Sequence, residues 1–191
     1  MLPLIVVAAT LASPPACQEI SLPETAHWDG HSYPLAEGVQ LRFGHDESLN
    51  SDADDGQRAM LFKTEGGATK RMYYSSGARD SSAMRPSFFS HCGPHQLLIL
   101  AEISNEYSWG FRVFAFDGTT LRDLGEIPIA ATGEHGPESA IPSVKLTPHD
   151  SVVSLTFSLA SVYKHPGERS EQKLAGKDVR YQIGATSIAE K

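Results

Sequence analysis

The segment His91-Cys92-Gly93-Pro94-His95 places three potential metal ligands within five residues. Imidazole and thiolate groups are the ligands that zinc and copper take in proteins. The Gly-Pro pair favours a turn that gathers these side chains, and a fourth ligand would have to come from elsewhere in the chain. The alternative is a turn at the entry to a strand, with Cys92 held in a disulfide and therefore withheld from a metal. We favour the turn and keep His91 and His95 as candidate ligands.

A second candidate metal site is the acidic stretch 50–56, in which Asp52 and Asp54 are the candidate calcium ligands. An EF-hand loop has oxygen ligands at positions 1, 3 and 5 and glycine at position 6. When Gly56 takes position 6, Ala53 takes position 3 and supplies no side-chain oxygen. We expect a solvated acidic loop, with an irregular calcium site as the alternative, and we predict no cofactor.

His27 and His31 have the spacing of the two zinc ligands in a His-Glu-x-x-His helix. The glutamate of that motif is absent, and Asp29-Gly30 between the histidines favours a turn. We expect an exposed turn here.

Residues 73–79, Tyr-Tyr-Ser-Ser-Gly-Ala-Arg, have the composition of a binding loop that follows a strand. Tyrosine and arginine are enriched among the residues that dominate binding energy at interfaces. The segment resembles the Ser-Gly loop that some periplasmic lysozyme inhibitors insert into the active site of their target, a likeness too short to assign a family. It implies a binding role for Tyr73, Tyr74, Ser76, Gly77 and Arg79. An ordinary hairpin loop is the alternative.

The elements that position these residues are predicted to be β-strands. Apolar and polar residues alternate in the ranges 39–43, 144–147, 153–159 and 179–183. Such alternation puts one face of a strand on a core and the other in water, as antiparallel sheets commonly do. By contrast, 97–103 and 111–116 are apolar on both faces, which predicts interior strands.

These patterns predict an all-β fold, a single antiparallel domain of about eight to ten short strands with little helix. A sandwich, a barrel and a propeller-like meander all fit the spacing of the turn residues. Trp109 stands beside Gly110 at the start of one predicted strand. Its large apolar area favours core packing, and a ligand-stacking role is the alternative for which we keep it as a candidate.

Residues 1–16 have the character of a secretory signal peptide. They carry no charged side chain, and their apolar run has the length of about 7–15 residues that a signal peptide needs. A transmembrane helix would need roughly 20. The absence of Lys or Arg and the position of Pro14 depart from the usual pattern, and a buried N-terminal strand is the alternative. We expect export to the periplasm or cell envelope, with residues 17–191 as the mature domain.

The expected state of the two cysteines, Cys17 and Cys92, depends on that compartment. In an oxidising environment a pair of cysteines favours a disulfide. Cys17 also stands directly after the expected cleavage point, where a bacterial lipoprotein carries its lipid anchor, although Pro14 replaces the usual aliphatic residue of that motif. The alternatives are a disulfide, a lipid at Cys17 and two free thiols.

The formal net charge of −7 gives the chain no electrostatic attraction for nucleic acid. The sequence also lacks the Gly-x-Ser-x-Gly motif of serine hydrolases. We therefore expect an exported binding protein whose partner is another protein, such as a secreted toxin or cell-wall hydrolase that it inhibits. The alternatives are an exported hydrolase or carbohydrate-active enzyme with a site assembled in space, with His91 and His95 among its candidates, and an envelope structural component.

Overall fold

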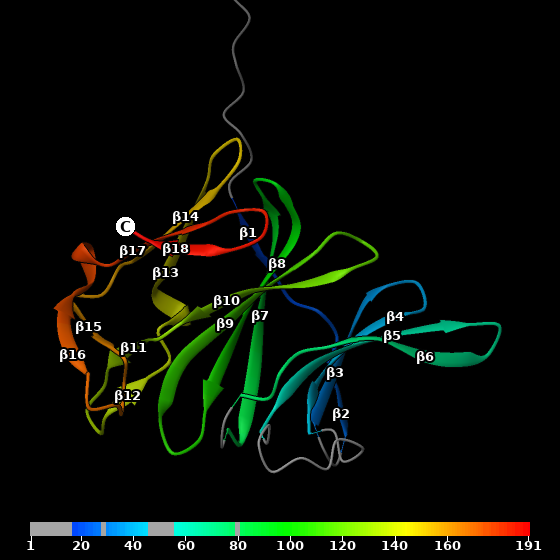
Figure 1. Cartoon of the computed structure of the whole chain (residues 1–191), viewed down its shortest axis with the longest axis horizontal. Helices are drawn as coiled ribbons and strands as arrows, with labels where there is room; N and C mark the ends of the chain where they lie inside the picture. The colour runs from blue at the N-terminus through cyan, green and yellow to red at the C-terminus, as the bar shows by residue number, and fades with distance from the viewer. Residues whose placement is uncertain (1–16, 28–29, 46–55, 79–80) are drawn as a thin grey trace, which may run out of the picture.

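The structure is a computed structural model that describes residues 17–27, 30–45, 56–78 and 81–191 (Figure 1). Within these residues, 18 strands form four antiparallel sheets, none of them closed, and two short 3-10 segments are the only helical structure. The prediction of an all-β antiparallel fold is confirmed. The strands outnumber the prediction because several have only two to four residues, too few to show alternation.

The N-terminal sheet is a meander in which each strand pairs with the next one along the chain. Its strands are β2 (Thr25–His27), β3 (Gly30–Ala36), β4 (Val39–Gly44), β5 (Arg58–Glu65) and β6 (Ala68–Tyr74). The alternation predicted for 39–43 is confirmed. Val39, Leu41 and Phe43 are buried, and Gln40 is exposed. Strand β6 is an edge of this sheet, and the β5–β6 hairpin forms one end of the molecule (Figure 1).

The central sheet has the strand order β1-β7-β8-β9-β10. These strands are β1 (Gln18–Ile20), β7 (Ala83–Cys92), β8 (His95–Ser104), β9 (Ser108–Phe116) and β10 (Leu121–Ile127). Both predicted interior segments lie here, 97–103 in β8 and 111–116 in β9. The consecutive residues Ile99 and Leu100 point to opposite faces and are both fully buried, so this sheet is covered on both sides.

The C-terminal part forms two four-stranded sheets, ordered β12-β11-β15-β16 and β13-β14-β17-β18. The first contains β11 (Ile129–Thr132), β12 (Pro137–Glu138), β15 (Ser161–Lys164) and β16 (Gln172–Ala175). The second contains β13 (Val144–Pro148), β14 (Val153–Phe157), β17 (Arg180–Ile183) and β18 (Ile188–Glu190). The 3-10 segments η1 (Ile141–Ser143) and η2 (Gly176–Asp178) precede β13 and β17.

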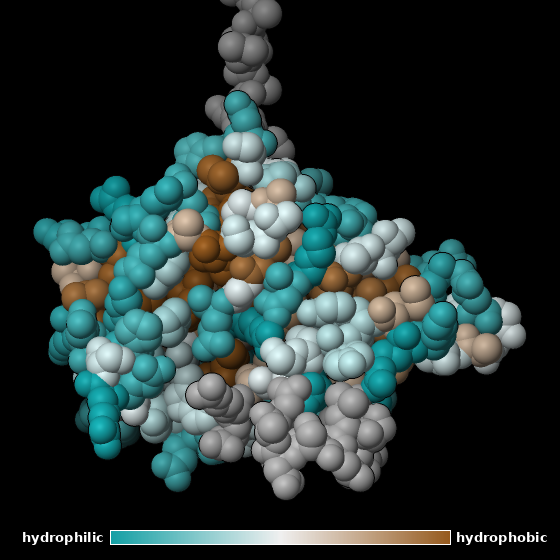
Figure 2. All heavy atoms as spheres, in the orientation of Figure 1, coloured by the Kyte–Doolittle hydropathy of each residue, from teal (hydrophilic) through white to brown (hydrophobic). Residues whose placement is uncertain are grey.

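Two hydrophobic cores lie on opposite faces of the central sheet. The first core joins it to the N-terminal sheet and includes Leu41, Phe43, Ile99 and Phe114. The second core joins it to the C-terminal sheets and includes Leu98, Leu100, Phe111, Leu155 and Ile183. Figure 2 shows hydrophobic residues as a band across the middle of one face, with mainly hydrophilic residues on either side.

Cys17 and Cys92 form a disulfide, as one of the sequence alternatives predicted. The bond joins the residue before β1 to the last residue of β7, the strand with which β1 pairs. A sulfur atom in a disulfide cannot also carry a lipid through a thioether, so the structure favours the disulfide over the lipid anchor at Cys17. The predicted signal peptide, 1–16, lies outside the described residues and stays a prediction.

Candidate functional site

The sequence-predicted binding residues lie in two neighbouring places. Tyr73 and Tyr74 are the last residues of the edge strand β6. Ser76, Gly77 and Trp109 line a cleft between β9 and the segment that follows β6.

A β-bulge at Met72 decides which side chains of β6 share a face. Arg71 and Tyr73 pair with consecutive residues of β5, so Met72 is an extra residue between them. In a regular strand Arg71 and Tyr74 would point to opposite faces, because they are three residues apart. The bulge brings them together, and the guanidinium of Arg71 lies 5.0 Å from the centre of the Tyr74 ring.

Strand β6 therefore presents an exposed apolar surface beside a cation. Met72 is 51% exposed and Tyr74 is 50% exposed, and these are the exposed large hydrophobic side chains in the described part of the chain. Tyr73 instead packs against the first core. Its burial, together with the negative charge of Asp123, raises the pKa of the Tyr73 phenol.

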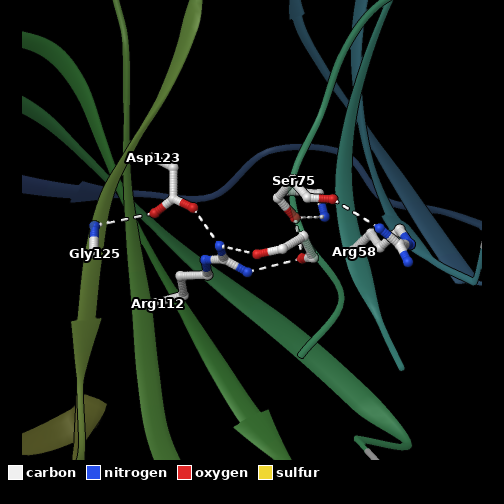
Figure 3. Close-up of polar contacts among 7 residues, drawn as sticks. Arg58, Ser75, Arg112, Asp123 and Gly125 are labelled. Carbon is white, nitrogen blue, oxygen red and sulfur yellow. Dashed lines mark hydrogen bonds and ion pairs between the residues drawn. The ribbon is translucent and has the colours of Figure 1, made fainter. Parts of the chain in front are cut away.

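The segment after β6 is held against β5 and does not project as an insertion loop would. Ser75 and Ala78 are buried. The backbone N–H of Ser75 donates to the carbonyl of Ala59 at 2.9 Å, and the Ser75 hydroxyl accepts from the Ala59 N–H at 3.1 Å. Arg58 donates to the Ser75 carbonyl at 3.0 Å (Figure 3). Arg79, the remaining predicted binding residue, lies outside the described residues.

Arg112 on β9 ties this segment to the central sheet (Figure 3). Its Nη1 donates to the Ser76 carbonyl at 2.8 Å and its Nη2 to the Ser76 hydroxyl at 2.6 Å. Nη2 also forms an ion pair with Asp123 of β10 at 2.5 Å, and Asp123 accepts from the backbone N–H of Gly125 at 3.0 Å. The side chains of Arg112 and Asp123 are only 13% and 22% exposed, so the ion pair is largely removed from solvent.

The cleft beside Arg112 has a volume of about 540 Å³. Its walls come from four segments that are distant in sequence: residues 76–78, the 103–112 region of β8 and β9, the β10–β11 junction and the turn 165–168. The polar side chains in the walls are those of Ser76, Arg112, Glu126, His165 and Glu168. Only Ser76, Gly77 and Trp109 were predicted, because the other contributors carry no motif.

Two glycines allow the walls of the cleft to approach each other. Gly110 has φ +119°, and a Cβ there would collide with the carbonyl of Ile127. Gly167 has φ +76°, and a Cβ there would collide with the ring and hydroxyl of Tyr107. The Tyr107 ring thus rests on Gly167 and meets Trp109 edge to face, with ring centres 6.3 Å apart.

The turn at 165–168 is fixed by backbone hydrogen bonds. The N–H of His165 donates to the Pro128 carbonyl at 2.9 Å, and that of Gly167 donates to the Glu171 carboxylate at 2.7 Å. His165 has φ 53°, in the left-handed region that a residue with a side chain seldom adopts. Strained backbone of this kind clusters at functional sites and persists only where the surroundings hold it.

The candidate metal ligands are not gathered in the described residues, where no group of three or more His, Cys, Asp or Glu side chains could hold a metal ion. His95 is buried, which lowers its pKa, and its Nε2 atom has no hydrogen-bond partner. His91 is exposed, and the sulfur of Cys92 is committed to the disulfide. Asp52 and Asp54 lie outside the described residues.

His27 and His31 lie on the adjacent strands β2 and β3. Each has its own partner, since His27 bonds the Ser32 hydroxyl at 2.8 Å and His31 bonds the Glu24 carboxylate at 2.7 Å. These contacts give both histidines a structural role at the β2–β3 hairpin.

The catalytic spacing Ser-x-x-Lys occurs at Ser170 and Lys173, where the Ser170 hydroxyl donates to the Glu168 carboxylate at 3.0 Å, and at Ser161 and Lys164. Ser161 and Lys164 are both in β15, where residues three apart point to opposite faces. Ser161 bonds the Thr132 hydroxyl at 3.0 Å and Lys164 pairs with Glu190 at 2.5 Å. Ser161 is therefore not activated by Lys164.

Comparisons of the chain with protein-family models, curated proteins and solved structures found no match. Within the described residues, no helix has the length and hydropathy needed to cross a membrane.

Proposed function

We propose that this chain is an exported binding protein that docks another protein along the edge of strand β6. The observation that carries the proposal is the pair Met72 and Tyr74, the exposed large hydrophobic side chains of the described residues, two positions apart on one edge strand. Exposed apolar groups of this size are enriched where proteins meet their partners.

The edge of β6 supports a specific mode of docking. In the described sheets β6 pairs with β5 on one side and forms the edge of the sheet on the other. An extended segment of a partner can add there as a further strand, with backbone hydrogen bonds giving affinity and side-chain contacts giving specificity.

The chemistry of β6 also favours an acidic partner segment. The strand carries Lys70 and Arg71 and no acidic residue, although the chain as a whole has a net charge of −7. Carboxylates of the partner would face these cations while its apolar side chains cover Met72 and Tyr74. Tyrosine and arginine are the residue types that most often dominate such contacts.

The predicted signal peptide supports a partner in the same exported compartment, and a secreted toxin or cell-wall hydrolase is the class we propose. Inhibition would be steric, through a docked edge strand that blocks access to the partner's site. The buried hydrogen bonds of Ser75 argue against a mechanism in which residues 75–78 insert into that site.

The test is quantitative recovery of partners from the exported fraction of the source cells on immobilised chain 17–191, followed by affinity measurement with the purified partner. The variant Met72→Ala/Tyr74→Ala is expected to weaken that affinity by at least about tenfold, the loss of roughly one large interface contact. The matched control is Gln172→Ala/Lys173→Ala, which removes two exposed side chains from β16, an edge strand of another sheet, and should leave affinity unchanged.

Circular dichroism confirms that each variant is folded before it is used. The proposal is overturned if the double variant at β6 keeps full affinity. Enrichment of no exported protein by the wild-type chain would overturn it as well.

A further inference from the structure

The cleft beside β9 has the size and composition of a small-ligand site and lies on residues other than Met72 and Tyr74. Ligand sites commonly enclose about 300–1,000 Å³ and combine aromatic walls with a few placed polar groups. This cleft has a volume of about 540 Å³ and contains both kinds of wall.

The aromatic wall is built from Tyr107 and Trp109. Their edge-to-face contact fixes one ring against the other, and Tyr107 is also held by its close approach to Gly167. Trp109 is partly buried against the first core, which holds the indole in place. An ordered aromatic surface of this kind packs well against the flat C–H face of a sugar ring, since both surfaces are apolar and rigid.

The polar wall offers hydrogen-bond acceptors and donors together. Glu126 and Glu168 bring carboxylates, while Arg112 brings a guanidinium that only donates. The Ser76 hydroxyl accepts from Arg112 and keeps its own O–H as a donor, and the His165 ring carries one donor and one acceptor when neutral.

This mixture separates the candidate ligands by their chemistry. An organic cation would be bound by acceptors and aromatic faces alone, and a phosphate by donors alone. A sugar hydroxyl donates and accepts at the same atom, so a ring of hydroxyls matches a wall that presents both. We propose that the cleft between Ser76, Trp109 and His165 binds a neutral saccharide, with the ring face on Tyr107 and Trp109 and the hydroxyls toward Glu168 and Arg112.

The left-handed backbone of His165 strengthens the assignment. The turn 165–168 reaches the cleft because the His165 N–H bonds to the Pro128 carbonyl and Gly167 accommodates Tyr107. The turn thus brings His165 and Glu168 into the lining of the cleft beside Tyr107, at the cost of a left-handed conformation at His165.

The test is isothermal titration of the chain 17–191 with four probes: an N-acetylglucosamine trisaccharide, a glucose trisaccharide, tetramethylammonium and inorganic phosphate. We expect saturable binding of at least one trisaccharide and of neither ion. The fluorescence of Trp109, read alone in a Trp28→Phe background because these are the two tryptophans of the chain, should change with the same saturation curve.

Two variants locate the binding. Tyr107→Ala should lower the affinity for the trisaccharide about tenfold, which corresponds to the loss of roughly 1.4 kcal/mol expected for an aromatic contact. Glu168→Gln changes an exposed side chain and should lower the affinity for the trisaccharide while the fold is retained. Tyr74→Ala, on the edge of β6, is the matched control and should bind as wild type.

The inference is overturned if no trisaccharide binds, if either ion binds in its place, or if both cleft variants bind the trisaccharide as wild type does. The proposal that a protein docks on β6 is tested independently, because that test uses variants of Met72 and Tyr74.

Discussion

Arg112 is the residue on which the candidate site depends most. Its guanidinium holds both oxygen atoms of Ser76 and the carboxylate of Asp123, and thereby connects the segment after β6 with β9 and β10. The same segment is one wall of the cleft and the continuation of the edge strand. Loss of Arg112 would release that wall and leave Asp123 without its counter-ion.

We therefore expect Arg112→Ala to lower the free energy of unfolding by about 2–4 kcal/mol, the range for breaking a largely buried, charge-assisted contact. Urea unfolding followed by circular dichroism measures this change. The control is Arg122→Ala, which removes the ion pair to Asp117 between side chains that are 46% and 41% exposed. An exposed pair contributes about 0–1 kcal/mol, so equal losses in the two variants would contradict the role assigned to Arg112.

Asp117 gives a prediction about acid stability. Hydrogen bonds from the backbone N–H groups of Thr120 and Thr119 hold the pKa of its carboxyl down to about 2, below the ordinary value of 3.8. Because the folded state favours the charged form, this contribution to stability is present above pH 4 and is lost as the pH falls toward 2. Its size is modest, since the side chain is 41% exposed to solvent.

Asp117→Asn keeps an oxygen that accepts the same hydrogen bonds but does not titrate. The wild-type free energy of unfolding should therefore fall more steeply than that of the variant between pH 4 and pH 2. Unfolding in urea at a series of pH values gives both slopes, and parallel slopes would show that these hydrogen bonds do not favour the charged form.

The residues of the cleft show what a sequence can reveal at this scale. Ser76, Gly77 and Trp109 were candidates because of their local composition. His165 and Glu168 were not, because nothing in their own neighbourhood indicates that the turn after β15 reaches β9. The available signals were indirect: Gly110 beside Trp109, and the Pro-Gly step at 166–167.

At the scale of elements, the strands that can be predicted from the sequence are the long ones with a clear pattern of burial. Strands such as β4 and β14 alternate over enough residues to be recognised, and β8 and β9 are apolar throughout because both faces are covered. Strand β12 has two residues and is stabilised only by its pairing with β11, which is a tertiary contact. The bulge in β6 was also hidden, because it depends on the register with β5.

The junction of β10 and β11 gives the prediction that belongs to this scale. It crosses β9 at Gly110, where a side chain would meet the Ile127 carbonyl. Gly110→Ala should lower the free energy of unfolding by about 2–4 kcal/mol, from the strain of positive φ and the overpacking together. Gly66→Ala is the control, because Gly66 also has positive φ but has no atom near its Cβ position, and it should cost only about 1 kcal/mol. Thermal unfolding of the two variants gives the comparison, and equal losses would mean that the crossing tolerates a side chain.

At the scale of the whole molecule, the central sheet joins two cores that would otherwise be separate. Each strand in its middle sends alternate side chains into the first core and the second core, so the order of one depends on the order of the other. Neighbouring residues Ile99 and Leu100 make this division within a single dipeptide, since both are fully buried and they face different cores.

This arrangement predicts that the two cores unfold together. Ile99→Ala and Leu100→Ala should each lower stability by about 2–5 kcal/mol through the cavity that they leave. Hydrogen exchange by global opening should accelerate in β4 and β14 alike in either variant, because the shared sheet transmits the loss to both sides. Acceleration confined to β4 in Ile99→Ala, or to β14 in Leu100→Ala, would instead show two units that open independently. Cooperative opening would mean that the edge of β6 and the cleft are held by one folding unit, so that a destabilising change in either core weakens both surfaces.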